Sequence, residues 1–381
     1  MFALALLAAT LGGPSAPSDP PAEDRARAAT LAGQAQALAA AGDVAAAIAR
    51  LEEAAAAAPG WAELKVNLAA LRSRSADYAG AIRDAAAALA IDPSLDGARY
   101  NLGIAQLKAG DGAAAAATLA RYAGQPSPAA VQAALGLALA ALERHAESAP
   151  ALQAAIETGA PDPALMLALI RALEAAGDAA RAAQWRDRLL REAPGSAAAL
   201  LIEGDGLDRG SDWAGAEAAY RRAVAADPRL PGAHYSVGLT SYKRRRYDEA
   251  ARAFREELAL QGAFAPALRY LALLELDRGR PSEAVPLLER LSVLAPRDQT
   301  VWRELGRAYL EAGRAPEAVT ALRRAVERSP DDPNGHFLLG RALRAVGREA
   351  EGAEAMRNAT RLNQRIREEL QEKVSGSPPP R

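Results

Sequence analysis

An all-α solenoid of tandem helix pairs is the fold class that this sequence predicts, and three observations support it. Prolines recur 34 residues apart, as at Pro194 and Pro228 and again at Pro296 and Pro330. Between these prolines, apolar residues follow the spacing of one helix face. The chain is 50% hydrophobic but only 4% aromatic, so small side chains provide most of its apolar surface. Such a composition suits thin layers of closely packed helices.

The repeating unit occurs ten times. Unit starts fall at residues 28, 62, 96, 129, 163, 197, 231, 265, 299 and 333. One residue is missing from the step near 124–128, and Gly262 stands where a proline would complete the series. A period of 20–50 residues indicates stacked supersecondary units. The sequence therefore predicts one continuous array rather than several separate globular domains.

One unit, residues 299–332, shows how each helix pair is specified. Trp302, Leu305 and Tyr309 occupy unit positions 4, 7 and 11, which share one face of a first helix. Gly313 at position 15 ends that helix, because glycine accepts the left-handed conformation required after a helix C-terminus. Small residues at positions 8 and 20 allow the two backbones to approach closely. Pro330 at position 32 then stops the second helix.

The same unit resembles the tetratricopeptide repeat. It matches the family pattern at Trp302, Leu305, Gly306, Tyr309, Gly313, Ala318, Ala325 and Pro330. Further matches occur in units 197–230 and 231–264, and the resemblance extends over residues 28–364. It implies a right-handed α-α superhelix of about ten helix pairs, with a concave face lined by the first helices. It also implies a protein that binds other proteins rather than an enzyme.

The two ends of the chain depart from the repeat. Residues 1–27 combine an apolar run, "MFALALLAATLGG", with a Pro/Ser-rich linker. The run has the length of a signal-peptide core and is too short to span a bilayer. It favours export to the periplasm or envelope of a bacterial cell if residues 1–20 act as a signal, and a cytoplasmic location otherwise. Residues 365–374 are expected to form a capping helix with Ile366, Leu370 and Val374 along one stripe, and 375–381 a disordered tail.

No constellation of catalytic residues is present, and we expect no enzymatic activity, no cofactor and no metal. The chain has no cysteine and three histidines, which lie in distant units. His234 and His336 occupy position 4, where they are expected to fill packing space. The run "YKRRRYDEA" at 242–250 is basic, but cations at the C-terminal end of a helix complement its dipole. With a net charge of −1, we expect no nucleic acid partner. No stretch approaches the ~20 apolar residues of a transmembrane helix, so we expect no integral membrane segment.

The first-helix positions that line the concave face in this family differ between the two halves of the chain. In the N-terminal units they hold small or aliphatic residues, including Ala32, Val66, Ile104 and Leu167. In the C-terminal units they hold aromatic residues and arginines, the types that dominate binding energy at protein interfaces. The resulting candidate binding residues are Tyr235, Tyr242, Arg269, Tyr270, Arg303, Arg307, Phe337, Arg341 and Arg344.

We hypothesise a scaffold or adaptor whose residues 231–345 hold an extended, partly acidic peptide of a protein partner. Arginines would pair with its carboxylates, and tyrosines would pack against its side chains. In the competing interpretation, these arginines pair with local acids such as Asp277, Glu304 and Glu311. Two other functions remain open: a regulatory or substrate-recruiting subunit of a separately encoded enzyme, and a homo-oligomer that closes its apolar N-terminal half on itself. The sequence leaves the oligomeric state undetermined.

Overall fold

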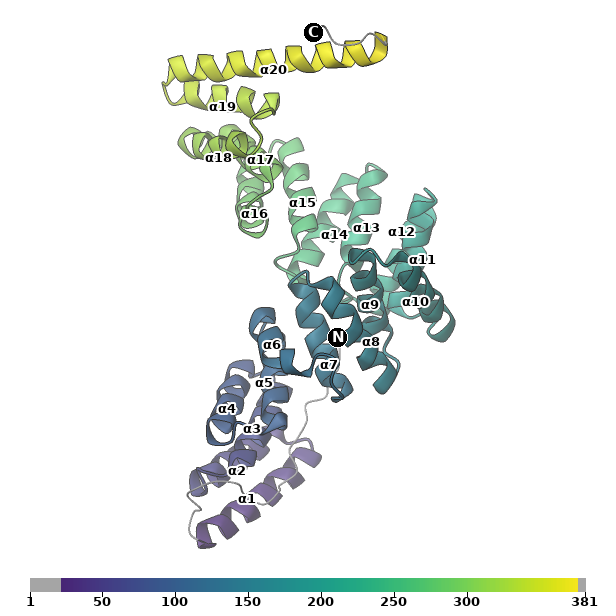
Figure 1. The fold of residues 1–381 in the computed structure, drawn as a ribbon, viewed down its shortest axis with the longest axis vertical. Coiled ribbons are helices and arrows are strands. Elements are labelled where there is room, and N and C mark those ends of the chain that lie inside the picture. Colours follow the sequence, from purple (N-terminus) through teal and green to yellow (C-terminus); the bar gives the residue numbers. More distant parts are fainter. Residues whose placement is uncertain (1–21, 376–381) are drawn as a thin grey trace. The chain divides into compact units, whose positions relative to one another are not determined.

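The computed structural model describes residues 22–375, and over this range the chain is built from α-helices and one short 3-10 helix. The helices form consecutive pairs, which we call helix A and helix B of each repeat (Figure 1). No described helix combines the length and the apolar character needed to cross a membrane. The predicted signal run and the predicted tail from residue 376 onward lie outside the described residues.

Two compact units divide the chain, at residues 1–199 and 200–381. In the first unit, consecutive helices pack on one another from α1 to α10. Its elements are α1 (Ala22–Ala40), α2 (Val44–Ala57), α3 (Ala62–Arg74), α4 (Tyr78–Ile91), α5 (Asp96–Lys108), α6 (Gly112–Leu119), the 3-10 helix η1 (Ala120–Tyr122), α7 (Ala129–Ala141), α8 (His145–Thr158), α9 (Pro163–Ala175) and α10 (Ala179–Glu192).

The second unit continues the same alternation, with each helix from α12 to α20 packed on the next. Helix α11 (Ala197–Arg209) contains the boundary between the units. The remaining helices are α12 (Trp213–Ala226), α13 (Ala233–Lys243), α14 (Tyr247–Leu260), α15 (Ala265–Asp277), α16 (Pro281–Leu294), α17 (Gln299–Glu311), α18 (Ala315–Arg328), α19 (Pro333–Ala345) and α20 (Glu349–Ser375).

Helix ends follow the punctuation of the sequence. Helices α12, α16 and α18 each end two residues before the proline at unit position 32, and α14 ends two residues before Gly262. Both residue types oppose helix continuation, proline because it lacks an N–H and clashes with the preceding turn. In the last repeat, position 32 is Gln364. Nothing there stops the helix, and α20 runs on to Ser375.

Two boundaries differ from those expected, and the end of the last helix is described with them. Helix α1 begins at Ala22, so residues 22–27, assigned to the linker, are helical. Helix α13 begins at Ala233, two residues after the unit start at 231, because Pro231 and Gly232 precede it and Gly232 has a φ of 82°. The capping segment 365–374 is the second half of α20, which is continuous from Glu349 to Ser375. The physical reason is the absence of proline and glycine between residues 361 and 366.

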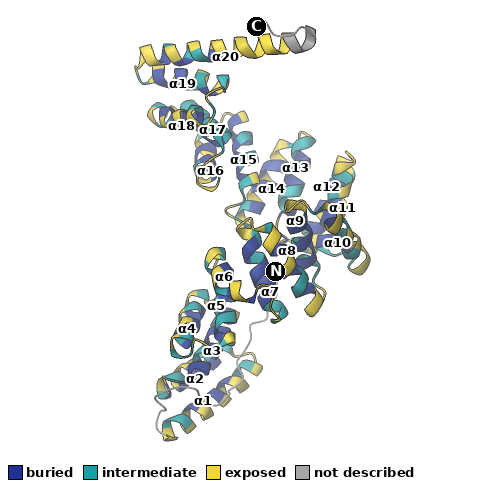
Figure 2. Ribbon diagram, in the orientation of Figure 1, coloured by how far each residue is buried: buried dark blue, intermediate teal, exposed yellow. Residues whose placement is uncertain are grey.

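The close approach of helices A and B depends on position 8. A Cβ added to Gly306 would lie 2.3 Å from Cγ of Leu322, and one added to Gly238 would lie 2.7 Å from the ring of Phe254. In both repeats the glycine faces the large residue sixteen positions later, on helix B. Small residues at position 8 therefore make room for the bulky side chain at position 24. The buried residues, dark blue in Figure 2, occur along all of the helix pairs.

The turn between helices A and B requires a left-handed residue at position 15. Gly313 has a φ of 75° there, and five other units also carry glycine with positive φ. In the remaining four units the position is Ala76, Glu143, Ser211 or Arg245, with φ between 58° and 63°. A side chain with a Cβ is strained in this region of backbone conformation.

We therefore expect Arg245→Gly to raise the free energy of unfolding by about 0.5–1 kcal/mol, because relief of the left-handed strain outweighs the entropy cost of glycine. Urea denaturation of the full chain measures the change. Gly313→Ala should shift stability in the opposite direction by a similar amount. If both substitutions changed the free energy of unfolding in the same direction, this account of the turn would be contradicted.

Candidate interaction surface

The nine candidate binding residues lie on four successive helices A of the second unit, α13, α15, α17 and α19. Their environments fall into three groups. The tyrosines pack against one another, three arginines pair with acids of the chain, and the residues of α19 are exposed. The three groups offer different chemistry to a partner, so each is described in turn.

The aromatic residues form one cluster around Phe254, which is fully buried on α14. Tyr270 stacks on Phe254 with ring centroids 5.6 Å apart, and Tyr235 lies 5.8 Å from the same ring. Tyr242 makes an edge contact with Tyr270 at 5.4 Å. Burial, followed by the proximity of Tyr270, raises the pKa of Tyr235 to about 12. These rings hold α13, α14 and α15 together, and only their outer edges remain accessible to a partner.

Arg269 and Arg303 each bind the first turn of the next helix A. Arg303 Nη1 donates to Oδ2 of Asp332 at 2.8 Å, and Arg269 donates to Asp298 and to Thr300 Oγ1. Asp298 and Asp332 are themselves the N-caps of α17 and α19. Burial opposes ionisation of Asp298, but hydrogen bonds from Thr300 and Arg269 outweigh it and lower its pKa. Each guanidinium thus links two repeats through a capping carboxylate.

One repeat earlier, aromatic residues occupy the two positions that correspond to Arg269 and Asp298. Tyr235 and Phe264 make an edge-to-face contact with centroids 5.2 Å apart, and Phe264 is the N-cap residue of α15. In all three repeats, the contact joins unit position 5 to position 34. We call it the 5–34 contact. It shows that Arg269 and Arg303 have a structural role between repeats.

Arg307 is surrounded by the three acids that the competing interpretation named. Its Nε donates to Glu311 at 2.8 Å, while Asp277 and Glu304 lie 3.9 Å from its terminal nitrogens. The hydrogen bond to Glu311 is the main reason why the pKa of Arg307 is raised. Its side chain is nonetheless partly exposed and on the helix surface, where ion pairs contribute little stability and exchange readily.

The three candidates on α19 form the open part of the surface. Phe337 is 48% exposed, and Arg341 and Arg344 are also exposed. Arg344 Nε lies 3.7 Å from Glu349, and Arg341 contacts no acid within residues 22–375. Spacings of four and three residues place these side chains on one face of the helix. The face offers one aromatic ring and two cations.

The basic run at 242–250 is engaged in ion pairs with the preceding repeat. Lys243 Nζ binds Asp208 at 2.6 Å, and Arg244 and Arg246 both pair with the buried carboxylate of Glu217. The expectation that these cations serve only to complement the helix dipole was therefore incomplete. The acids that neutralise this run lie 27 to 35 residues earlier in sequence, too far for a local pattern to reveal.

The position-4 side chains share a specific role in packing. Trp302 Nε1 donates to the carbonyl of Pro296 at 2.9 Å, and Nε2 of His234 and of His336 bonds the equivalent carbonyls of Pro228 and Pro330. A ring nitrogen thus satisfies a backbone acceptor at the end of the preceding helix B. Within the described residues, no group of three or more potential ligands is arranged to hold a metal ion.

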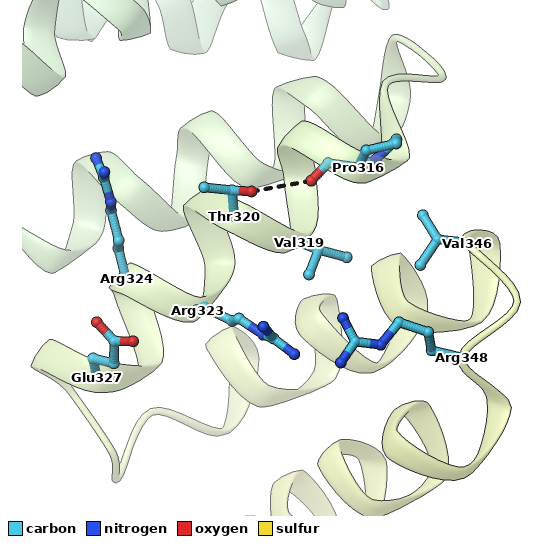
Figure 3. A pocket seen from close by; sticks show the side chains of 8 residues that line it. All are labelled: Pro316, Val319, Thr320, Arg323, Arg324, Glu327, Val346 and Arg348. Atoms are coloured by element: carbon cyan, nitrogen blue, oxygen red, sulfur yellow. Dashed lines mark hydrogen bonds between the residues drawn. The ribbon is translucent and has the colours of Figure 1, made fainter.

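A pocket of about 490 Å³ was not foreseen from the sequence. It lies between α18 and the turn that joins α19 to α20, and Figure 3 shows Arg323 and Arg348 pointing toward each other across it. Both arginines contact Glu351, at 3.3 Å and 2.6 Å, and Arg324 lies over the ring of Trp302. Its cations are thus already engaged, and none of the nine candidate residues lines it.

In the first unit, the apolar residues expected to line the concave face are mostly interior. Ala32, Val66, Ala70, Ile104, Ala133 and Leu167 are all buried. Helices A pack directly on one another here, α3 on α5, α5 on α7 and α7 on α9. Because these helices contact one another, the expected apolar surface is buried within the chain. These six residues are therefore not exposed to a second copy of the chain, as a homo-oligomer closed through them would require.

A family model described as "Tetratricopeptide repeat" matches residues 133–197, 203–267, 270–333 and 311–365, together more than half of the chain. The chain belongs to the tetratricopeptide repeat family. Tetratricopeptide repeats are typically non-catalytic modules for protein interaction, which agrees with the coarse expectation from the sequence. The matched segments begin at residue 133. The first three repeats are therefore assigned from the structure and from the 34-residue spacing of the sequence.

Solved structures of tetratricopeptide repeat proteins resemble this chain over about half its length. MamA from Desulfovibrio magneticus RS-1 is 20% identical, with a TM-score of 0.41, and covers 44% of this chain and 95% of its own. YrrB, a protein "with an unusual peptide-binding site", is 18% identical, with a TM-score of 0.45, and covers 50% of this chain and 97% of its own. No curated protein matches the chain in sequence.

Proposed function

We propose that the chain is a non-enzymatic scaffold that holds an extended, acidic peptide of a protein partner on the helix A face of α13–α19. The supporting observation is the surface of α19, where Phe337, Arg341 and Arg344 lie exposed on one face. A guanidinium can form paired hydrogen bonds with a carboxylate, and an exposed aromatic ring provides an apolar anchor. We therefore place the main anchoring residues on α19.

The other candidates contribute less to this proposal. Arg269 and Arg303 already bind carboxylates of the chain in the 5–34 contact, and their release would uncouple adjacent repeats. Arg307 can exchange its exposed partner Glu311 for a peptide carboxylate. The peptide would then run from α19 toward α17 and the outer edge of the tyrosine cluster. Charge reversal of Arg303 would therefore disturb folding as well as binding.

A displayed library of short random peptides tests the proposal. We expect the peptides selected by the full chain to be enriched in Asp and Glu. Arg341→Glu combined with Arg344→Glu should weaken the selected peptides by at least about tenfold, because each lost charge-assisted hydrogen bond contributes roughly 1.5–3 kcal/mol. Fluorescence anisotropy measures the affinity.

A matched control changes the same net charge elsewhere. Arg252→Glu combined with Arg357→Glu alters two exposed arginines on the B helices α14 and α20. We expect this variant to bind the selected peptides as the unaltered chain does. Peptides without acidic enrichment, or an equal loss of binding in both double variants, would show that α19 is not the site.

A further inference from the structure

A second pocket of the second unit lies where α14, α15 and α16 meet. Its volume is about 400 Å³, and Leu258, Leu271 and Leu287 form its apolar part. Leu271 is buried, and the other two leucines are partly exposed. None of the nine candidate binding residues lines this pocket. Its size lies at the lower end of the roughly 300–1,000 Å³ range of ligand sites.

The charged residues around this pocket balance one another. Arg255 and Arg290 line it together with Glu275 and Glu283, so the lining carries two cations and two anions. Arg255 pairs with Glu275, and Arg290 donates to the carbonyl oxygen of Gly262. Since charge complementarity selects partners, a balanced lining favours an uncharged group over a charged one. This distinguishes the pocket from the cationic surface of α19.

One oxygen atom of the lining lacks a hydrogen-bond donor. Glu275 is 1% exposed, and its Oε1 pairs with Arg255. Its Oε2 accepts no hydrogen bond from any residue that the structure describes, and Nη1 of Arg280 lies 3.6 Å away. The side chain of Arg280 is 54% exposed and can therefore move aside. Because a buried acceptor without a donor is costly, a ligand that supplies the donor is favoured.

The next repeat shows which side chain fits the corresponding space. Residues 20 apart join unit position 25 of one repeat to position 11 of the next, as Arg255 with Glu275 and Glu289 with Tyr309. The hydroxyl of Tyr309 donates to Oε1 of Glu289 at 2.7 Å, and the residue is buried. Burial, followed by this hydrogen bond, raises the pKa of Tyr309 to about 12. A tyrosine thus occupies position 11 of α17, where α15 carries the shorter Glu275.

A cation beside the ring also has a counterpart at the pocket. The guanidinium of Arg314, at position 16, lies over the ring of Tyr309 and 4.5 Å from its centroid. Arg280 holds position 16 one repeat earlier and lies 3.6 Å from Glu275, a residue of the pocket lining. A cation over an aromatic face is attracted by the ring. An aromatic ring in the pocket would therefore meet Arg280 as Tyr309 meets Arg314.

We propose that the pocket between α14, α15 and α16 binds a tyrosine side chain of a partner protein. The ring would lie against the three leucines, and its hydroxyl would donate to Oε2 of Glu275. Phenylalanine lacks that donor, and lysine or arginine would add a charge to a balanced lining. Tyrosines held in pockets contribute much of the binding energy at protein interfaces. The pocket is separate from α19, so this proposal does not depend on the acidic peptide.

The small molecule p-cresol reproduces the tyrosine side chain and tests the proposal on the full chain. In NMR spectra of methyl-labelled leucine, we expect p-cresol to shift the resonances of the three lining leucines in a saturable manner. Toluene, which lacks the hydroxyl, should bind at least about tenfold more weakly. Equal affinity of the two would show that Glu275 is not the acceptor. No saturable shift with p-cresol, or tighter binding of 3-methylindole, would also overturn the assignment to tyrosine.

A variant that blocks the pocket entrance establishes where p-cresol binds. Ala259 lines the pocket and is exposed, so Ala259→Trp should lower the affinity for p-cresol at least about tenfold without disturbing the core. Ala225 is the equivalent exposed residue of α12, and Ala225→Trp should leave the affinity unchanged. Circular dichroism checks that both variants fold. Unchanged binding in Ala259→Trp, or an equal loss in both variants, would contradict the proposed site.

Discussion

Phe254→Ala is expected to lower the free energy of unfolding by about 3–5 kcal/mol, the range for removing a buried aromatic side chain. Phe254 is fully buried on α14, and its ring is stacked by Tyr270 and approached by Tyr235. Its ring also covers the backbone of Gly238, which has no side chain to fill the space left behind. Loss of the ring therefore opens a cavity shared by α13, α14 and α15.

Urea denaturation followed by circular dichroism measures this loss, and hydrogen exchange should localise it to residues 233–277. Tyr247→Ala provides the control, since Tyr247 belongs to the same helix but is 44% exposed. Exposed substitutions of this kind usually change stability by no more than about 0.5 kcal/mol. A comparable loss in both variants would mean that the cluster does not form the core of these three helices.

Gly306→Ala is expected to lower the free energy of unfolding by about 2 kcal/mol, although alanine is the better helix former. The added Cβ would lie 2.3 Å from Cγ of Leu322. Leu322 is fully buried in the core between α17 and α18, so its branch point cannot move aside without displacing neighbours. Overpacking therefore dominates over helix propensity at this position.

The same substitution at Gly206 should have the opposite sign. Gly206 lies within α11, and a Cβ there would meet no atom within 4 Å. We expect Gly206→Ala to raise the free energy of unfolding by up to about 1 kcal/mol through helix propensity alone. Thermal and urea unfolding of the two variants give the comparison. If Gly306→Ala were also stabilising, helices A and B would not be held at the distance seen here.

Helix boundaries were predictable because they depend on local sterics. Pro228, Pro296 and Pro330 stop helices whatever the rest of the chain does, and Gly313 ends α17 in the expected left-handed conformation. The extension of α20 follows from the same rule, since Gln364 takes the place of a proline.

Partners 27 to 35 residues apart were not predictable in the same way. Arg303 was assigned to a ligand because its position in the family lines a binding face, and nothing nearby in sequence marks Asp332 as its acceptor. An aspartate at a helix start is already explained as a cap of its own helix. For Arg307 the competing interpretation named Glu311, which lies one turn away and accepts its hydrogen bond. Local electrostatics can be inferred from spacing, but pairing across repeats requires the structure.

The buried face of the first unit has a related cause. Positions were assigned to the concave surface by family analogy, which assumes a fixed separation between successive helices A. Val66 and Ile104 are instead interior, because α3 contacts α5 and α5 contacts α7. Helix α17 also contacts α19 in the second unit, so contact between successive helices A is not confined to the first unit.

The 5–34 contact also bears on how an array of this kind can change its length. Both members of each pair, such as Arg269 with Asp298, belong to the same 34-residue segment. A gene duplication or loss that copies or removes the whole segment from 265 to 298 therefore carries a matched pair with it. A duplication or deletion whose boundaries fall within helices B would instead separate the members of a pair. It would place Tyr235 opposite an aspartate, or Arg303 opposite Ile366. Inheritance in whole segments is thus the route by which such a chain lengthens without mismatched junctions.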